Sequence, residues 1–206
     1  MALLHQATLT PSKRELIDGW LPGRSWAPRG VQLTPVGTYR FDDPAGEVGL
    51  EGFLLGADDG TVLHVPLTYR GAPLDGGDEF LVGTTDHSVL GKRWVYDACG
   101  DPVWASTLVN AVLNGGSEAD LLIEIDGVMQ ERDKSVRVHG TGSEGIDVPL
   151  ISEVSARDDG DSTLVEAGPF DLVVVRRVGA EVAGDETLVG SWEGVPSAVL
   201  AGVRRR

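Results

Sequence analysis

Glycine and proline residues are spread along the whole chain and divide it into short apolar runs. The 206 residues include 28 glycines and 11 prolines, and both residue types favour backbone turns. Short runs that are bounded by turn residues are typical of β-strands joined by hairpins. Hairpins connect antiparallel strands. The sequence therefore predicts a fold that consists mainly of antiparallel β-sheet.

Two segments have helical patterns instead. Residues 10–17 place a hydroxyl side chain before a proline, which is a common start of a helix, and residues 101–113 repeat this arrangement with an aspartate. Apolar residues follow at one-turn spacing in both segments. We expect both helices to pack against one sheet, with Leu16, Trp104 and Leu108 buried.

The other apolar runs are predicted strands. Before the second helix they cover residues 31–40, 47–55, 61–67 and 79–83, and after it they cover 120–125, 135–139, 150–154, 163–166, 170–177, 187–192 and 198–203. A hairpin turn is expected at residues 57–60. The turn-rich stretch 114–117 predicts a joint between a cap-like front unit, residues 1–116, and a rear unit, residues 117–206. The predicted fold class is therefore α+β, with two short helices in the front unit and an all-β rear unit.

The charge of the chain bears on its partners. Asp and Glu number 32 and Lys and Arg number 17, so the net charge is −15. This charge repels phosphate backbones and anionic lipid surfaces, so we expect neither nucleic acid nor membrane as a partner. The basic residues 204–206 are interpreted as a solvated tail. No apolar run reaches the roughly 18 residues of a membrane span, and no cleavable leader is recognised, so we expect a cytoplasmic protein.

No residue pattern points to a metal, a cofactor or a catalytic group. The single cysteine, Cys99, excludes an internal disulfide and multi-cysteine zinc sites and is interpreted as a buried structural thiol. The four histidines lie singly and lack metal-ligand spacing; His64 is interpreted as a structural or surface residue. Residues 140–145 fit the pattern Gly-x-Gly-x-x-Gly. A strand with an early proline follows instead of a helix, so a turn is favoured over a phosphate loop.

Three landmarks in the front unit resemble one known family. They are Trp20-Leu21-Pro22-Gly23-Arg24-Ser25-Trp26, the strand at residues 60–69 and the stretch at residues 94–102. In this order they resemble the maltokinase N-terminal cap domain over roughly residues 8–116. The family usually has arginine before the second tryptophan and phenylalanine after it, whereas this chain has Ser25 and Ala27.

The resemblance has consequences for catalysis. In a maltokinase the cap precedes a second β-rich subdomain and a large helical lobe that carries the phosphoryl-transfer residues. The sequence ends at Arg206 without such a lobe, so the resemblance implies a stand-alone, non-catalytic protein. The rear unit resembles the second subdomain of the kinase N-lobe, but Val173 stands where that family has its phosphate-facing lysine. The acidic loop 158–161 stands where the family approaches the phosphates of the nucleotide, which it would repel. We therefore expect neither catalysis nor a bound cofactor.

The resemblance also implies a role in the metabolism of trehalose, maltose 1-phosphate and α-glucans. The leading hypothesis is a cap-like protein that binds another protein, such as a sugar kinase or an α-glucan enzyme. The alternatives are the accessory half of a split sugar kinase and a sugar- or nucleotide-binding module. Trp26 and Arg24 are the candidate contact residues, because rigid loops that expose tryptophan and arginine are frequent interface hot spots. Trp26 is expected at the surface and Trp20 inside.

Overall fold

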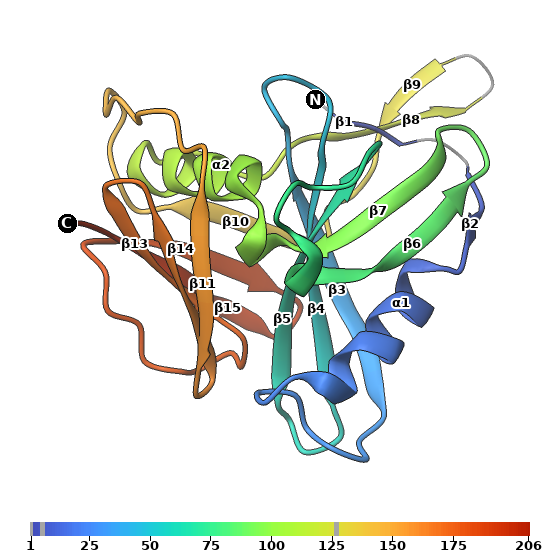
Figure 1. The fold of residues 1–206 in the computed structure, drawn as a ribbon, viewed down its shortest axis with the longest axis horizontal. Coiled ribbons are helices and arrows are strands. Elements are labelled where there is room, and N and C mark those ends of the chain that lie inside the picture. The colour runs from blue at the N-terminus through green and yellow to red at the C-terminus, as the bar shows by residue number, and fades with distance from the viewer. Residues whose placement is uncertain (1, 5–6, 126–127) are drawn as a thin grey trace.

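A computed structural model describes residues 2–4, 7–125 and 128–206, and these residues form three sheets (Figure 1). The first sheet has the order β2-β6-β7-β5-β4-β3 and the second has the order β10-β14-β15-β13-β12-β11; all neighbours within them are antiparallel. The first sheet contains β2 (Leu9–Thr10), β3 (Leu33–Phe41), β4 (Gly49–Ala57), β5 (Val62–Arg70), β6 (Leu81–His87) and β7 (Gly91–Asp97). The second contains β10 (Val136–Gly140), β11 (Val154–Asp159), β12 (Ser162–Ala167), β13 (Phe170–Val175), β14 (Glu186–Trp192) and β15 (Val195–Arg205). A small third sheet joins β1 (Ala2–Leu4), β8 (Leu121–Ile125) and β9 (Val128–Glu131), with β1 and β8 parallel. The predicted α+β class, dominated by antiparallel strands, is confirmed.

Several strands differ from the sequence prediction. Strand β7 was not expected, because the run from Gly91 to Asp97 mixes charged and apolar residues. It is a strand because it pairs with β5 on one side and β6 on the other. The strand expected at residues 150–154 starts only at Val154.

The hairpin predicted at residues 57–60 is present between β4 and β5. Gly60 has φ +86°, which a residue with a side chain rarely adopts. Its N–H donates to the carbonyl of Ala57 at 3.0 Å. The carboxylate of Asp59 accepts the N–H of Thr61 at 2.9 Å. This turn returns the chain into β5 with the register that pairs Gly49 with Tyr69.

The first helix, α1 (Lys13–Trp20), begins two residues later than a cap at Thr10 would place it. Thr10 is paired in β2 with Asp86 of β6. Ser12 is the cap: its hydroxyl accepts the N–H of Glu15, and the carboxylate of Glu15 accepts the N–H of Ser12 at 2.7 Å. A short 3-10 turn, η1 (Leu21–Gly23), ends the helix.

The second helix, α2 (Pro102–Leu113), begins at the predicted aspartate cap, since Asp101 accepts the N–H of Val103 at 3.0 Å. The two helices pack on different sheets: α1 contacts β6, whereas α2 contacts β10, β12, β14 and β15 (Figure 1). The expectation that both pack on one sheet is therefore wrong. Trp104 and Leu108 are buried as predicted, while Leu16 is only partly buried. Helical periodicity identifies the buried face of α2, but it carries no information about which sheet covers that face.

The two large sheets meet along a shared core that includes Leu50 and Leu54 of β4 together with residues of the second sheet. Gly37 of β3 permits this approach, because a Cβ atom there would lie 2.7 Å from a methyl carbon of Val136. The N–H of Thr38 also donates to the hydroxyl of Ser135 at 3.0 Å. The division of the chain at residues 116 and 117 stays a prediction.

Candidate functional site

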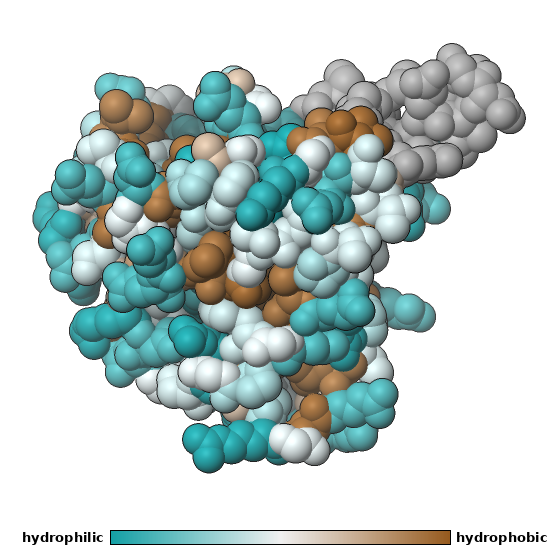
Figure 2. Space-filling model, turned by 45° about the vertical axis from the view of Figure 1, so that its right-hand side comes forward, coloured by the Kyte–Doolittle hydropathy of each residue, from teal (hydrophilic) through white to brown (hydrophobic). Residues whose placement is uncertain are grey.

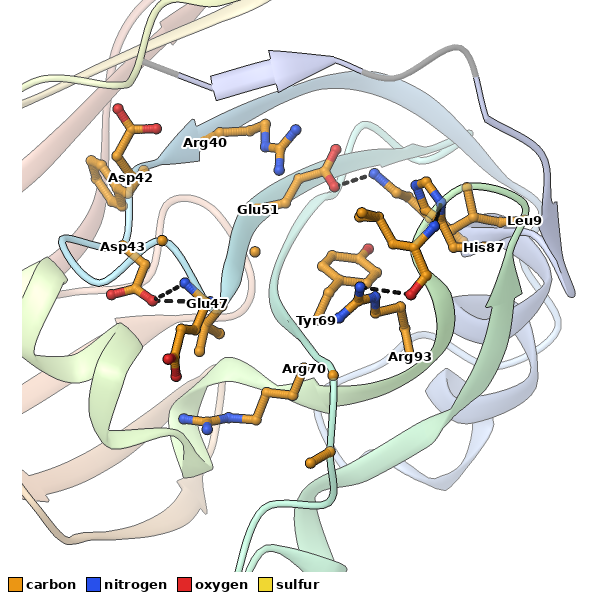
Figure 3. Close-up of a pocket in the computed structure, with 18 of the residues that line it drawn as sticks. Leu9, Arg40, Asp42, Asp43, Glu47, Glu51, Tyr69, Arg70, His87 and Arg93 are labelled. Atoms are coloured by element: carbon orange, nitrogen blue, oxygen red, sulfur yellow. Dashed lines mark hydrogen bonds and ion pairs between the residues drawn. The ribbon is translucent and has the colours of Figure 1, made fainter.

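The candidate site is a cleft of about 1030 Å³ at one end of the first sheet (Figure 3). Residues of all six strands of this sheet contribute to its lining, together with the turn at residues 42–48, residues 71–73 and the start of α1. The strand register explains which side chains meet there. Arg40 pairs with Glu51, Gly49 with Tyr69, and Tyr69 with Val95, two residues from Arg93. Because side chains alternate along a strand, Arg40, Glu51, Tyr69 and Arg93 lie on one face of the sheet.

Lys13 neutralises the most deeply buried carboxylate of the cleft. Its ammonium group forms an ion pair with Glu51, whose side chain is 8% exposed. The same ammonium nitrogen lies 5.0 Å from the ring centroid of Tyr69 and 5.8 Å from that of Phe53. The ion pair and the cation–π contacts hold the first turn of α1 over the sheet.

Arg70 is bound to the start of α2. Its Nε and Nη2 atoms donate to the two carboxylate oxygens of Asp101 at 2.7 and 2.6 Å. This hydrogen bonding raises the pKa of Arg70 above its usual value, with burial acting in the opposite direction. Since Asp101 is also the cap of α2, the bidentate pair connects one rim of the cleft to that helix.

The carboxylate of Asp43 is hydrogen-bonded to the backbone of the turn in which it lies. It accepts the backbone N–H groups of Ala45, Glu47 and Val48 at 3.0, 2.9 and 2.9 Å. Three such hydrogen bonds leave this carboxylate little remaining capacity to pair with an arginine of the cleft.

Three donors in the cleft wall have no protein partner. The Nε atoms of Arg40 and Arg93 and the hydroxyl of Tyr69 are buried and form no hydrogen bond in the described part of the chain. A buried donor without a partner costs about 1–3 kcal/mol. Burial first and Glu51 second raise the pKa of Tyr69 well above its usual value, so this hydroxyl keeps its proton at neutral pH. The wall therefore offers donors and lacks acceptors for them.

Two glycines keep the space beside these donors open. A Cβ atom on Gly71 would lie 2.8 Å from Nη1 of Arg93. One on Gly49 would lie 3.4 Å from Cβ of Tyr69 and 3.8 Å from Nη2 of Arg40. Side chains at these two positions would occupy the cleft.

Trp26 does not lie at the surface, so the expectation of an exposed tryptophan there is wrong. The side chain is 1% exposed. Its ring packs edge-on against Trp20 at 5.8 Å, and the guanidinium of Arg176 lies 4.8 Å from it. The carbonyl of Trp26 accepts a hydrogen bond from Nε of Arg177 at 2.8 Å, which holds the loop onto residues that follow β13. Trp20 is buried, as predicted.

Arg24 is half-buried, and its guanidinium carbon lies 4.9 Å from the centroid of the Trp20 ring. Its role as a contact residue stays a prediction. Sequence reasoning did not single out Arg40, Tyr69 or Arg93. Only their positions in neighbouring strands reveal them, because 52 residues lie between Arg40 and Arg93 in the sequence.

The residues that could suggest catalysis have structural roles. Cys99 is buried as predicted, and burial raises the pKa of its thiol well above the usual value. His64 is buried between Tyr39, whose hydroxyl lies 2.8 Å from Nε2, and the carbonyl of Val175, 3.0 Å from Nδ1. Burial lowers the pKa of His64 to about 3. A histidine with this pKa and no access to solvent does not act as a general base near neutral pH.

The Gly-x-Gly-x-x-Gly segment forms a turn against the end of α2, as predicted. The N–H of Gly142 donates to the carbonyl of Val112 at 3.0 Å, and a Cβ atom on Gly140 would lie 2.1 Å from the carbonyl oxygen of Ala111. These glycines allow close packing on helix carbonyls. The carbonyl end of a helix carries partial negative charge and repels phosphate.

The described residues contain neither of two further kinds of site, a cluster of metal-binding side chains and a membrane-spanning helix. No group of three or more His, Cys, Asp or Glu side chains among those residues is arranged to hold a metal ion. None of the helices formed by them is both long enough and apolar enough to cross a membrane.

Comparison with known families identifies the segment that holds most of the cleft. Residues 20–101 match the maltokinase N-terminal cap domain. The resemblance stated from the sequence is confirmed for this segment, which includes Arg40, Glu51, Tyr69 and Arg93. The cap domain is the N-terminal, non-catalytic part of maltokinase. No curated protein gives a significant match to the chain.

Proposed function

We propose that this protein is a non-catalytic, cap-like module that acts in the cytoplasm by binding another protein of maltokinase-related α-glucan metabolism. The match of residues 20–101 to the cap domain is the observation that carries the proposal. In a maltokinase the cap stands beside domains that perform the chemistry, so a module of this kind works by contact with another protein.

Two observations support a role without phosphoryl transfer. The glycine-rich segment at residues 140–145 lies against the carbonyl end of α2, where the electrostatic environment disfavours phosphate. The acidic loop at residues 158–161 is the turn between β11 and β12, and its Asp161 carbonyl accepts the N–H groups of Arg176 and Arg177. Both segments therefore have roles in the packing of the second sheet.

The contact surface that we propose is the loop after α1, with Arg24 as its main residue. Pro22, Gly23 and Ser25 are exposed around it. The rings of Trp20 and Trp26 support the loop from inside, which makes it rigid and lowers the entropy lost on binding. Elsewhere, the face drawn in Figure 2 is mainly hydrophilic, with apolar residues in separate patches.

Calorimetric titration of the purified chain with a purified maltokinase from the same organism tests the proposal. We expect a dissociation constant below about 100 μM, near −5.5 kcal/mol. Arg24→Ala should weaken binding at least about thirtyfold, the threshold of an interface hot spot. Arg157→Ala, which removes an exposed charge from β11, is the matched control and should bind like the wild type.

Two results would overturn the proposal. The first is a lack of binding at protein concentrations of about 100 μM. The second is phosphotransfer to maltose that appears only when both chains are mixed, because that result identifies the accessory half of a split kinase. If Arg24→Ala binds as tightly as the wild type, the loop is not part of the interface.

A further inference from the structure

We infer that the cleft of the first sheet is a binding site for a small molecule that carries an oxyanion. Arg40 and Arg93 are the main residues that bind the oxyanion, and the Tyr69 hydroxyl is a further donor. A phosphate and a carboxylate share this chemistry, since both present several acceptor oxygens to an arginine fork. This inference does not depend on the proposed protein contact at the Arg24 loop, because the cleft would bind an anion whether or not a protein partner is bound there.

The first argument is the state of the two arginines. Arg40 has no ion pair in the described part of the chain, and its buried Nε atom lacks a hydrogen bond. Arg93 donates through Nη2 to the carbonyl of Leu90 at 2.8 Å, while its Nε atom has no partner. By contrast, Lys13 and Arg70 are each paired with a carboxylate. The positive charge available to a ligand is therefore that of Arg40 and Arg93.

The second argument is the state of the nearby carboxylates. Glu51 is paired with Lys13, and Asp43 accepts three backbone N–H groups. Figure 3 shows Asp43 and Glu47 on one side of the cleft and Tyr69 and Arg93 on the other. Tyr69 and Arg93 thus lie across the cleft from Asp43 and Glu47, which leaves a place for the oxygens of a ligand. Glu51 is the cross-strand neighbour of Arg40, but its charge is already paired with that of Lys13.

The third argument is space. Gly49 and Gly71 leave room directly beside Tyr69, Arg40 and Arg93. The cleft of about 1030 Å³ is as large as the upper end of ordinary small-molecule sites. A neutral sugar could accept hydrogen bonds from these donors through its hydroxyl oxygens, but it would leave the positive charges of Arg40 and Arg93 without a counter-charge.

Titration of the full chain with inorganic phosphate, acetate and maltose tests the inference. Binding is measured by calorimetry, and the site is located by shifts of backbone amide signals in NMR spectra. We expect phosphate, acetate or both to bind and to shift the amide signals of β3, β5 and β7. A stronger response to phosphate identifies a phosphate ester as the ligand class, and a stronger response to acetate identifies a carboxylate.

Two variants probe charge and space separately. Arg40→Gln removes one of the two positive charges that bind the anion, and it should weaken anion binding at least about tenfold. Gly49→Leu keeps every charge and fills the cleft, and it should also weaken binding about tenfold or more; its backbone needs no positive φ. Arg157→Gln, on the exposed side of β11, is the matched control for a lost positive charge and should bind like the wild type. Unchanged melting temperatures show that the variants are folded.

Three results would overturn the inference. One is the lack of any amide shift in the cleft with phosphate and acetate at about 20 mM. Another is equal anion affinity of Arg40→Gln, Gly49→Leu and wild-type protein. The third is binding of maltose without binding of either anion, which would assign the cleft to a neutral sugar.

Discussion

Arg176 and Asp97 form a buried ion pair between the two large sheets, and Asp97→Asn is expected to destabilise the protein strongly. Nη2 of Arg176 donates to Oδ2 of Asp97 at 2.5 Å and lies 3.1 Å from the sulfur of Cys99. Nε donates to the hydroxyl of Thr163 at 2.7 Å, and the ring of Trp26 lies 4.8 Å from the guanidinium. Arg176 has no exposed surface, so water does not compensate a charge left behind there.

The expected loss in the free energy of unfolding is about 3–5 kcal/mol, because removal of one partner leaves an uncompensated charge in the interior. This is a large part of the roughly 5–15 kcal/mol by which whole domains are stable. Replacing both partners, by Asp97→Leu together with Arg176→Met, should recover most of the loss. Apolar side chains of similar size are often as stable in the interior as a buried ion pair.

Urea denaturation followed by tryptophan fluorescence measures these differences, since Trp26 lies directly against Arg176. Arg204→Met is the control: it breaks a pair with Asp171 in which the arginine side chain is 58% exposed. That variant should lose no more than about 1 kcal/mol. If Asp97→Asn loses as little as the control, the reasoning about the buried charge is refuted.

Three further predictions concern the core, the pH dependence and nucleotide binding. Trp104→Ala should lower the free energy of unfolding by about 3–5 kcal/mol in the same urea assay, because it empties a fully buried aromatic site; an unchanged midpoint would contradict this. Because the pKa of His64 falls from 6.5 to about 3 on folding, the unfolded chain binds more protons in this range. Stability should then fall by up to about 1.4 kcal/mol per unit as the pH drops from 6.5 towards 3, and His64→Gln should flatten that slope. Calorimetry with ATP and magnesium should give no binding tighter than about 100 μM, and a tighter constant would contradict the expectation of a protein that does not use nucleotide.

The sequence alone determined the fold class and, for α2, the cap and the buried face, because these depend on neighbouring residues. At the start of α2 the carboxylate of Asp101 accepts the N–H of Val103, and Pro102 has no N–H that needs a partner, wherever the helix packs. The spacing of Trp104 and Leu108 identifies its buried side. The landmarks between residues 20 and 101 were sufficient to recognise the cap domain.

Tertiary structure decided which surfaces meet. The loop at residues 20–26 has the composition of an exposed contact, but a hydrogen bond from Arg177 and the guanidinium of Arg176 bring Trp26 into the interior. Helix α2 lies on the second sheet because residues far along the chain cover its apolar face.

The cleft is also a product of tertiary structure. Arg40, Tyr69 and Arg93 belong to three strands, and the sequence of each gives no reason to connect it with the others. Pairing of β4 with β3 and β5, and of β5 with β7, places their side chains on one face of the sheet. Local propensity acts over a few residues, whereas a binding site needs contacts between distant segments, and only the strand order and register supply them.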